Sequence, residues 1–222
     1  MADKQVEIYG LAGPVAVGKG TVLGWLKAAY GDDVVIIGVG NILRQEIKNG
    51  TELGAIAKGY MDQAMLVPSE LINKMVHGRI AEIQKEGKAR KVILDGYPRN
   101  VEQAKTVISS NISIRRVIEL TLPDETLVER GSDRECCESC GETFTIKNLF
   151  KRSKVKGVCD VCGGKVSRRS DDEPEKVRKR LESYKNETYP MFDVLRDANI
   201  ECVTIDNSLS DARERFFEAV GF

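Results

Sequence analysis

Residues 13–21 read GPVAVGKGT and carry the residue types of a phosphate-binding loop. In the P-loop pattern, G-x-x-x-x-G-K-[ST], consecutive backbone N–H groups surround a phosphate chain and the lysine reaches its outer oxygens. Gly13, Gly18 and Lys19 fit this pattern, whereas the hydroxyl of Thr21 comes one position late and the loop interior contains no glycine. The spacing predicts a nucleotide phosphate site with an unusual interior.

Six cysteines include two C-x-x-C pairs, which eighteen residues separate. A glycine follows the second cysteine of each pair and permits the tight turn that aims both sulfurs at one ion. Two vicinal dithiols or disulfides are the alternative, but a cytosolic chain favours metal. The sequence therefore predicts a closed, structural zinc site whose ligands are Cys137, Cys140, Cys159 and Cys162. Cys136 is interpreted as a packing residue or a spare thiol, and Cys202 as a core residue.

The pentapeptide DGYPR, residues 95–99, directly follows a short apolar run. In open parallel sheets, ligands bind at the edge where such strands end. Asp95 there has the chemistry to hold Mg²⁺ through water molecules, and Arg99 to clamp a phosphate with two hydrogen bonds. A turn or helix cap is the alternative role for Asp95.

These residues need a scaffold, and apolar runs alternating with helical patterns predict one. Continuous β-branched runs that alternate with helices are typical of a parallel sheet covered on both faces. The five expected strands are Val6–Gly10, Val34–Ile37, Lys91–Leu94, Arg116–Leu122 and Glu201–Ile205. The expected helices are Thr21–Tyr30, Ile42–Lys48, Thr51–Gln63, Pro68–Glu86, Val101–Ser109, Asp124–Glu129, Glu173–Tyr189 (ended or kinked by Pro190) and Ser210–Val220. The prediction is a three-layer α/β/α fold of the P-loop class.

Composition argues against other classes of protein. The 222 residues are 41% hydrophobic and 31% charged, and 34 basic residues balance 34 acidic ones, so no net charge favours nucleic acid or membrane. No apolar run approaches membrane-spanning length, and MADKQVEIYG lacks the regions of a signal peptide, so we expect a cytoplasmic protein. Between Arg130 and Arg180 the chain is modestly basic but offers only Phe144 and Phe150 for base stacking, which disfavours nucleic-acid binding.

With these motifs the chain resembles the adenylate kinase family, in its long form with a zinc-bearing lid. The resemblance runs from about Val6 to Ile205. Besides the loop and the two cysteine pairs, it rests on NILRQEIKNGTELG, MDQAMLVPSEL, DGYPRNVEQA, ERGSDRECCESCG and RRSDDEPEKVRKRLESY. It implies reversible Mg²⁺-dependent transfer of a phosphoryl group from ATP to AMP, giving two ADP, by a monomer.

The resemblance also implies roles for individual residues. The ATP side would comprise Ala16, Val17, Gly18, Lys19, Gly20, Thr21, Arg130, Arg134, Thr143 and Phe144. The AMP side would comprise Val39, Arg44, Met65, Leu66, Val67, Gly96, Tyr97, Pro98, Arg99, Gln103, Arg169 and Arg180. The catalytic cations would be Lys19, Arg44, Arg99, Arg134, Arg169 and Arg180. Asp95 would associate with Mg²⁺, and Asp171 and Asp172 would position Arg169 and Arg180 through ion pairs.

Three parts follow from the same resemblance. Residues 1–38, 87–129 and 170–222 would form the core, residues 39–86 a helical insertion that binds the monophosphate, and residues 130–169 an inserted, zinc-ribbon-like lid. Zinc would stiffen a lid too small for its own core. His77 is expected to have a surface or packing role, and Arg168 and Arg178 to be solvated.

The chain departs from the family pattern at three places. Ala16 stands where glycine is usual, and its Cβ is tolerated in the loop if its φ is negative. Val39 and Asn41 replace a hydroxyl and a carboxylate near the acceptor base, so AMP is favoured through Gln103 while GMP, CMP and UMP stay open.

The third departure is in the lid, where Asp133 and Glu135 flank Arg134 and are expected to compete for it. A nucleotide-binding module with reduced catalysis is the alternative that these substitutions suggest.

Overall fold

The computed structural model describes residues 6–87, 89–146, 152–169 and 171–222. The parts of the predicted ranges that fall on residues 1–5, 88, 147–151 and 170, Phe150 among them, lie outside the described residues.

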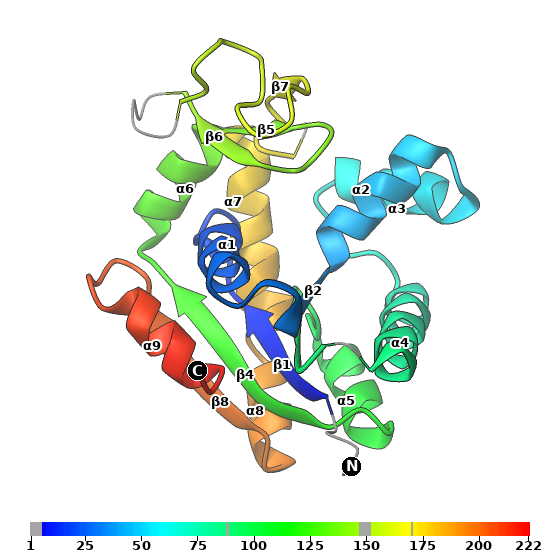
Figure 1. Ribbon diagram of the computed structural model, residues 1–222. Coiled ribbons are helices and arrows are strands. Elements are labelled where there is room, and N and C mark those ends of the chain that lie inside the picture. The colour runs from blue at the N-terminus through cyan, green and yellow to red at the C-terminus, as the bar shows by residue number, and fades with distance from the viewer. Residues whose placement is uncertain (1–5, 88, 147–151, 170) are drawn as a thin grey trace.

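A five-stranded parallel sheet forms the centre of the molecule, as predicted (Figure 1). The strands, in sheet order, are β2 (Val34–Gly38), β3 (Lys91–Asp95), β1 (Glu7–Ala12), β4 (Ile114–Thr121) and β8 (Glu201–Asp206). In register, Leu11 of β1 lies opposite Asp95 of β3 and opposite Ile118 of β4. Three central strands therefore bring their carboxyl ends to one edge.

Helices cover both faces of this sheet because successive strand residues point to opposite sides. In β3, the Ile93 side chain belongs to one buried cluster, whereas Val92 and Leu94 belong to the other. The Ile93 side packs against α1 (Lys19–Tyr30), α6 (Asp124–Ser132), α7 (Pro174–Ser183) and α9 (Ala212–Ala219). The Val92 side packs against α4 (Ser69–Glu86), α5 (Val101–Ser109) and α8 (Met191–Asp197).

A helical hairpin, α2 (Val39–Asn49) and α3 (Glu52–Asp62), projects beyond the edge of the sheet at β2 (Figure 1). Thr51 caps α3, its hydroxyl accepting a hydrogen bond from the Gly54 N–H at 3.0 Å. A Cβ on Gly54 would lie 2.2 Å from the carbonyl oxygen of Glu46, so only glycine permits this close approach of the two helices.

A small antiparallel sheet, which we call the lid, stands above the carboxyl edge of the large sheet (Figure 1). Its strands are β5 (Arg134–Cys137), β6 (Thr143–Thr145) and β7 (Val166–Ser167), in the order β6-β5-β7. Helix α6 leads into the lid and α7 leads back to the core. Its buried cluster consists of two cysteines, Phe144 and Val166.

One part of the helix prediction is wrong. The expected helix Glu173–Tyr189 is α7, which ends at Ser183, followed by the π-helical turn η3 (Tyr184–Thr188). Pro190 then caps the start of α8, which the sequence analysis did not predict. Proline at a helix start loses no intrahelical hydrogen bond, so Pro190 kinks the chain and begins a new helix rather than ending helical structure.

The sequence predicts no membrane-spanning segment, and the helices of the structure bear on this expectation. Within the described ranges, none of the helices combines the length and apolar character needed to cross a bilayer.

Candidate active site

The glycine loop, residues 13–21, joins the end of β1 to the start of α1. Gly13 has a φ of 143°, and a Cβ there would lie 2.8 Å from the carbonyl oxygen of Leu120. Gly18 has a φ of 106°, and its carbonyl accepts the N–H of Thr21 at 2.9 Å to begin the helix. The N–H groups of Lys19 and Gly20 precede this first bond, and N–H groups at the start of a helix lack acceptors within it, so this end of α1 can receive an anion.

Ala16 adopts a left-handed backbone conformation, with a φ of 62°. The condition under which the loop tolerates a Cβ without strain, a negative φ, is therefore not met. This region costs a residue with a Cβ about 1–2 kcal/mol. The loop lies against α6, since a Cβ on Gly131 would lie 3.6 Å from the Ala16 methyl and 3.0 Å from Val177. The loop therefore holds Ala16 in a strained backbone conformation.

Lys19 is held by main-chain carbonyls of its own loop. Its Nζ donates to the Gly13 oxygen at 2.6 Å and to the Pro14 oxygen at 3.1 Å. Burial lowers the pKa of Lys19 to about 8, against the opposing charge of Asp95, and the nearby Arg99 adds to the lowering. Carbonyl dipoles hold this ammonium in place without neutralising it.

Asp95, at the end of β3, lies close enough to Lys19 and Arg99 to interact with both charges. Burial raises the pKa of its carboxyl group while those cations oppose the rise. Within the described part of the chain, its Oδ1 is buried and has no hydrogen-bond partner. A buried oxygen acceptor of this kind fits a water molecule of a hydrated Mg²⁺, which makes Asp95 suited to the predicted metal.

The segment after β3 is shaped by a cis peptide bond between Tyr97 and Pro98. The Arg99 N–H donates to Oε1 of Gln103 at 2.7 Å, so the buried amide of Gln103 is fixed beside Arg99. Burial lowers the pKa of Arg99, and Asp95 counters this. Gly96, Pro98, Arg99 and Gln103 line the cleft at this edge of the sheet.

The Tyr97 side chain points elsewhere. Its hydroxyl donates to Oδ1 of Asn73 at 2.8 Å and lies 3.0 Å from Nε2 of His77, and the side chain is 1% exposed. If Tyr97 belongs to the acceptor side, as predicted, only its backbone can therefore contribute there. His77 stacks edge-on against Tyr97, which is the packing role expected for it.

On the α2 side, Arg44 reaches into the cleft from the first turns of the helix. Its Nη2 donates to Oδ1 of Asn41 at 2.7 Å. Burial, together with the nearby charge of Arg169, lowers the pKa of Arg44 to about 10. Asn41 thus orients this guanidinium without supplying a negative charge. Val39 is buried and presents no hydroxyl, and the cleft continues along Met65, Leu66 and Val67.

Two buried aspartates hold the arginines of the opposite wall. Arg134, in β5, donates from Nε to Oδ2 of Asp172 at 2.8 Å and from Nη2 to Oδ1 at 2.5 Å. Arg180, in α7, donates to Oδ2 of Asp171 at 2.7 Å and to Asp172 at 3.4 Å. Asp172 is fully buried. We call these four residues the aspartate cluster.

The pKa values within this cluster follow from the pairing. Burial alone would lower the pKa of Arg134, but the hydrogen bonds and charge of Asp172 raise it above the usual value. Burial would raise the pKa of Asp171, but Arg180 and Arg169 hold it below the usual range. The bidentate partner of Arg134 is thus Asp172, and competition from the flanking Asp133 and Glu135 stays a prediction.

Arg130, at the end of α6, and Thr143, in the lid, line the same cleft. Phe144, which was expected to flank the ATP base, is 6% exposed and packs in the lid cluster with Cys137 and Val166. Successive residues of a strand point to opposite sides, so β6 cannot direct both Thr143 and Phe144 side chains into the cleft. The side chain of Phe144 is therefore a core residue of the lid.

Four thiols meet within the lid. The Sγ atoms of Cys137, Cys140, Cys159 and Cys162 all lie within 4.8 Å of one another. The 137–162 and 140–159 sulfur pairs are 3.5 and 3.6 Å apart, near the ~3.8 Å edge of a tetrahedron with Zn–S bonds of about 2.3 Å. The N–H groups of Ser139 and Val161 each lie 3.4 Å from a cysteine sulfur, as turns that stabilise thiolates require. The donor set fits zinc.

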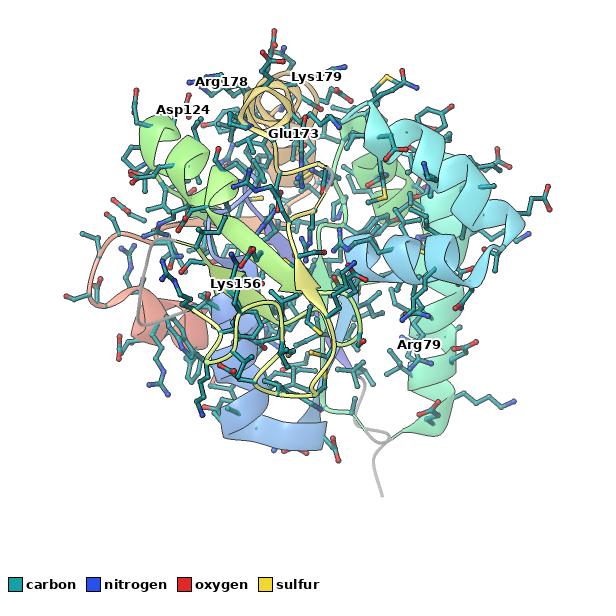
Figure 2. All side chains as sticks on the ribbon, turned by 90° about the horizontal axis from the view of Figure 1, so that it is seen from above. Arg79, Asp124, Lys156, Glu173, Arg178 and Lys179 are labelled. Carbon is teal, nitrogen blue, oxygen red and sulfur yellow. The ribbon has the colours of Figure 1, made fainter. Side chains whose placement is uncertain are left out.

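Cys136 stands outside this thiol group. It is buried on the opposite side of β5 from Cys137, with its sulfur 4.0 Å from the Thr143 hydroxyl. This is a packing position, one of the two roles expected for it. Among the other basic residues, Arg178 lies on the outer side of α7 with Lys179 (Figure 2), and the exposed Arg168 donates to the carbonyl of Ser132.

Several residues that line the cleft were not predicted from the sequence, among them Asn207, Tyr184 and Thr188. Asn207 follows β8, and its Nδ2 donates to the carbonyl of Val17 at 2.6 Å. Tyr184 and Thr188 come from the π-helical turn η3, a kind of irregularity often found at functional sites. The Tyr184 hydroxyl donates to the buried carboxylate of Glu119 at 2.8 Å.

All these elements surround one cleft of about 1220 Å³, larger than the roughly 300–1,000 Å³ of a usual small-molecule pocket. It runs from the glycine loop, under the lid, to α2 and the DGYPR segment. Six cations predicted from the sequence line it: Lys19, Arg44, Arg99, Arg134, Arg169 and Arg180. Its size and charge suit two anionic ligands placed end to end.

Comparison with known proteins assigns a family to this architecture. The adenylate kinase family model matches residues 11–200. The chain is 35% identical over 217 residues to the adenylate kinase of Caldicellulosiruptor saccharolyticus, covering 95% of this chain and 97% of that protein. It is 41% identical over 204 residues to that of Caldanaerobacter subterraneus subsp. tengcongensis, covering 90% and 89%. The chain belongs to the adenylate kinase family.

Proposed function

We propose that this protein is an ATP:AMP phosphotransferase, which reversibly transfers the γ-phosphoryl group of ATP to a phosphate oxygen of AMP and yields two ADP. One observation carries the proposal: six cationic side chains from separate elements converge on a single cleft beside a glycine loop. The family assignment points to the same reaction. Its partners would be the two nucleotides, and the protein would be a cytoplasmic monomer.

The chemistry follows from the charge that two nucleotides bring together. Phosphoryl transfer asks the protein mainly to position the two oxygens in line and to stabilise charge on the transferring group. The P-loop, residues 13–21, would bind the ATP phosphates with its N–H groups and Lys19. Arg44 and Arg99 would bind the AMP phosphate, and the lid would bring Arg134 to the ATP phosphates. The aspartate cluster keeps Arg134 and Arg180 oriented before any nucleotide arrives.

Two metals complete the proposal. Mg²⁺ would be held through water by Asp95, and there it would offset the negative charge of the phosphate groups. Zn²⁺ would be bound by the four lid cysteines, whose donor set leaves no open coordination position. The second metal would then support the lid rather than take part in the reaction.

The three-part division belongs to the same proposal. Residues 1–38, 87–129 and 170–222 would form the core, residues 39–86 the monophosphate insertion and residues 130–169 the lid. A second cavity of about 680 Å³ lies between the insertion and the lid, lined from one side by Lys48 and from the other by Glu138. Closing this space would bring the two parts together over the nucleotides and exclude water that would otherwise accept the phosphoryl group.

Another nucleoside monophosphate is the second candidate acceptor, because Val39 is apolar at the acceptor end of the cleft. A coupled assay for ADP with ATP and each of AMP, GMP, CMP and UMP, with and without Mg²⁺, separates the candidates. We expect turnover with AMP that requires Mg²⁺. Preference for another monophosphate would reassign the acceptor, and ATP binding without turnover would indicate a module with reduced catalysis.

A further inference from the structure

Asn207 lies at the carboxyl edge of the sheet, in a turn held on two sides. Its own N–H donates to the Thr121 carbonyl of β4 at 3.0 Å. The preceding Asp206 accepts hydrogen bonds from the N–H and the hydroxyl of Ser208, at 2.9 and 2.7 Å. These hydrogen bonds of the turn thus position the Asn207 side chain next to the glycine loop.

The Asn207 amide contacts the loop at one peptide unit. Its Nδ2 donates to the Val17 carbonyl at 2.6 Å, across 190 positions of sequence. The same nitrogen stands 2.5 Å from where a Cβ of Gly18 would be, so the side chain also covers that glycine. The contact joins the last strand of the sheet to the middle of the loop.

This contact determines which way one N–H of the loop points. In a trans peptide, the C=O and the N–H point in opposite directions, so holding the Val17 carbonyl toward Asn207 turns the Gly18 N–H to the other side. Gly18, at a φ of 106°, would otherwise allow this peptide to rotate readily. A loop that binds phosphate through N–H groups works only while those groups face the ligand.

We propose that Asn207 is a positioning residue for the ATP side of the cleft: it fixes the Val17–Gly18 peptide so that the Gly18 N–H stays available to a nucleotide phosphate. The inference rests on the proposed binding of ATP by the glycine loop. Asn207 itself does not touch the reacting groups. Its effect is confined to the loop, because the acceptor-side residues Arg44, Arg99 and Gln103 come from other elements.

Isothermal titration calorimetry with MgATP alone and with AMP alone tests this on Asn207→Ala, Asn207→Asp and Ser208→Ala. Loss of one net hydrogen bond predicts about fivefold weaker ATP binding for Asn207→Ala. Asn207→Asp keeps the shape, removes the donor and adds negative charge near the phosphates, so we expect a larger loss. Ser208→Ala alters the same turn without touching the loop and should bind ATP within twofold of the parent protein.

AMP affinity and the melting temperature separate positioning from general destabilisation. We expect AMP affinity to stay within twofold in all three variants. Unchanged ATP affinity in Asn207→Ala and Asn207→Asp, or equal weakening of ATP and AMP, overturns the proposal. If Asn207→Ala does not fold, Asn207→Ser, which keeps a shorter donor, gives the same comparison. The proposed function fails separately, if the parent protein produces no ADP; a parent that binds no ATP overturns both.

Discussion

The two walls of the cleft hold their cations in different ways. On the glycine-loop side, Lys19 rests on the carbonyls of Gly13 and Pro14. On the other side, Arg134 and Arg180 rest on the carboxylates of the aspartate cluster. Carbonyl dipoles orient a cation but add no opposite charge, whereas a buried carboxylate both orients and neutralises.

The difference is visible in the pKa directions. Burial lowers the pKa of Lys19 to about 8, while the hydrogen bonds of Asp172 overcome burial and raise the pKa of Arg134. Burial lowers the pKa of Arg180 as well, to about 10, but the charge of Asp171 opposes this and the guanidinium stays charged at neutral pH. The loop side is therefore ready to accept negative charge from a ligand but is sensitive to pH. The aspartate side is stable in its charge, and a nucleotide must draw its arginines away from existing partners.

The largest effect is expected from removing an arginine of the aspartate cluster. Arg180→Ala should lower kcat by about 10³-fold, since a cation that stabilises charge on a transferring phosphoryl group contributes on that scale. It also leaves Asp171 without its 2.7 Å partner. Steady-state kinetics with both nucleotides measures the loss.

Arg178→Ala is the matched control on the same helix. Arg178 is exposed on the outer side of α7, two residues before Arg180 (Figure 2). Its activity should stay within twofold of the parent protein. Equal losses in both variants would mean that the charge of the helix, rather than the position of Arg180 in the cleft, supports activity.

The second effect concerns the proposed zinc site, because the lid carries Arg134 and its buried cluster is small, with only Phe144 and Val166 beside two of the cysteines. Cys137→Ser should abolish the tetrathiolate site, reduce zinc content below one ion per chain, and lower activity by about 10²-fold, the upper end of the effect of disturbing metal-site partners. The core sheet packs independently on both faces, so its thermal unfolding should change little.

Cys136→Ser is the control, since Cys136 is adjacent in sequence but outside the sulfur group. It should retain zinc, measured by atomic absorption, and near-parental activity. If Cys137→Ser keeps full activity without zinc, the lid does not depend on metal, and the contrast between a core held by apolar packing and a lid held by thiolates is wrong.

Features that depend on residues close together in the sequence were predictable, whereas contacts between residues far apart in the sequence were not. The five strands were predictable because β-branched runs such as Val34–Ile37 are local signals. The clustering of the four cysteines was predictable because a C-x-x-C turn aims its two sulfurs together over four residues. The helix α8 was missed because Pro190 is equally compatible with ending a helix and with beginning one.

The contacts between distant segments lie beyond such patterns. Asp172 is 38 residues from Arg134, and Asn207 is 190 residues from Val17. Nothing in the neighbouring sequence of either residue specifies its partner, because the sheet topology brings them together. The left-handed φ of Ala16 is likewise imposed by the loop, since alanine alone prefers negative φ.

A pH profile gives the third effect and tests the loop side alone. Lys19, with a pKa of about 8, loses its charge as the pH rises, so kcat/KM for ATP should be constant near pH 7 and about tenfold lower at pH 9. The free energy of unfolding should respond in the opposite direction. The pKa of Lys19 is lower in the folded chain than in the unfolded chain, so at pH values between the two the unfolded chain binds more protons. The contribution of Lys19 to stability therefore rises with pH in this range. A flat kcat/KM profile between pH 7 and 9 would contradict the claim that Lys19, held only by carbonyl groups, loses its charge in this range.

The smallest effect is expected from Ala16→Gly. Removing the Cβ relieves the strain of the left-handed backbone, about 1–2 kcal/mol. Glycine also increases the conformational entropy of the unfolded chain, which lowers stability by roughly 0.4–1 kcal/mol. The net gain in the free energy of unfolding should therefore be about 0.5–1 kcal/mol. The relaxed loop should also lower the KM for ATP, by up to about fivefold. Asn199→Gly is the control, because Asn199 has a φ of 59° in the turn before β8, away from the cleft. It should gain stability without any change in KM. If Ala16→Gly gains stability and leaves ATP kinetics unchanged, the strain at this position lies outside the phosphate-binding function, and the loop side is limited by Lys19 rather than by its backbone.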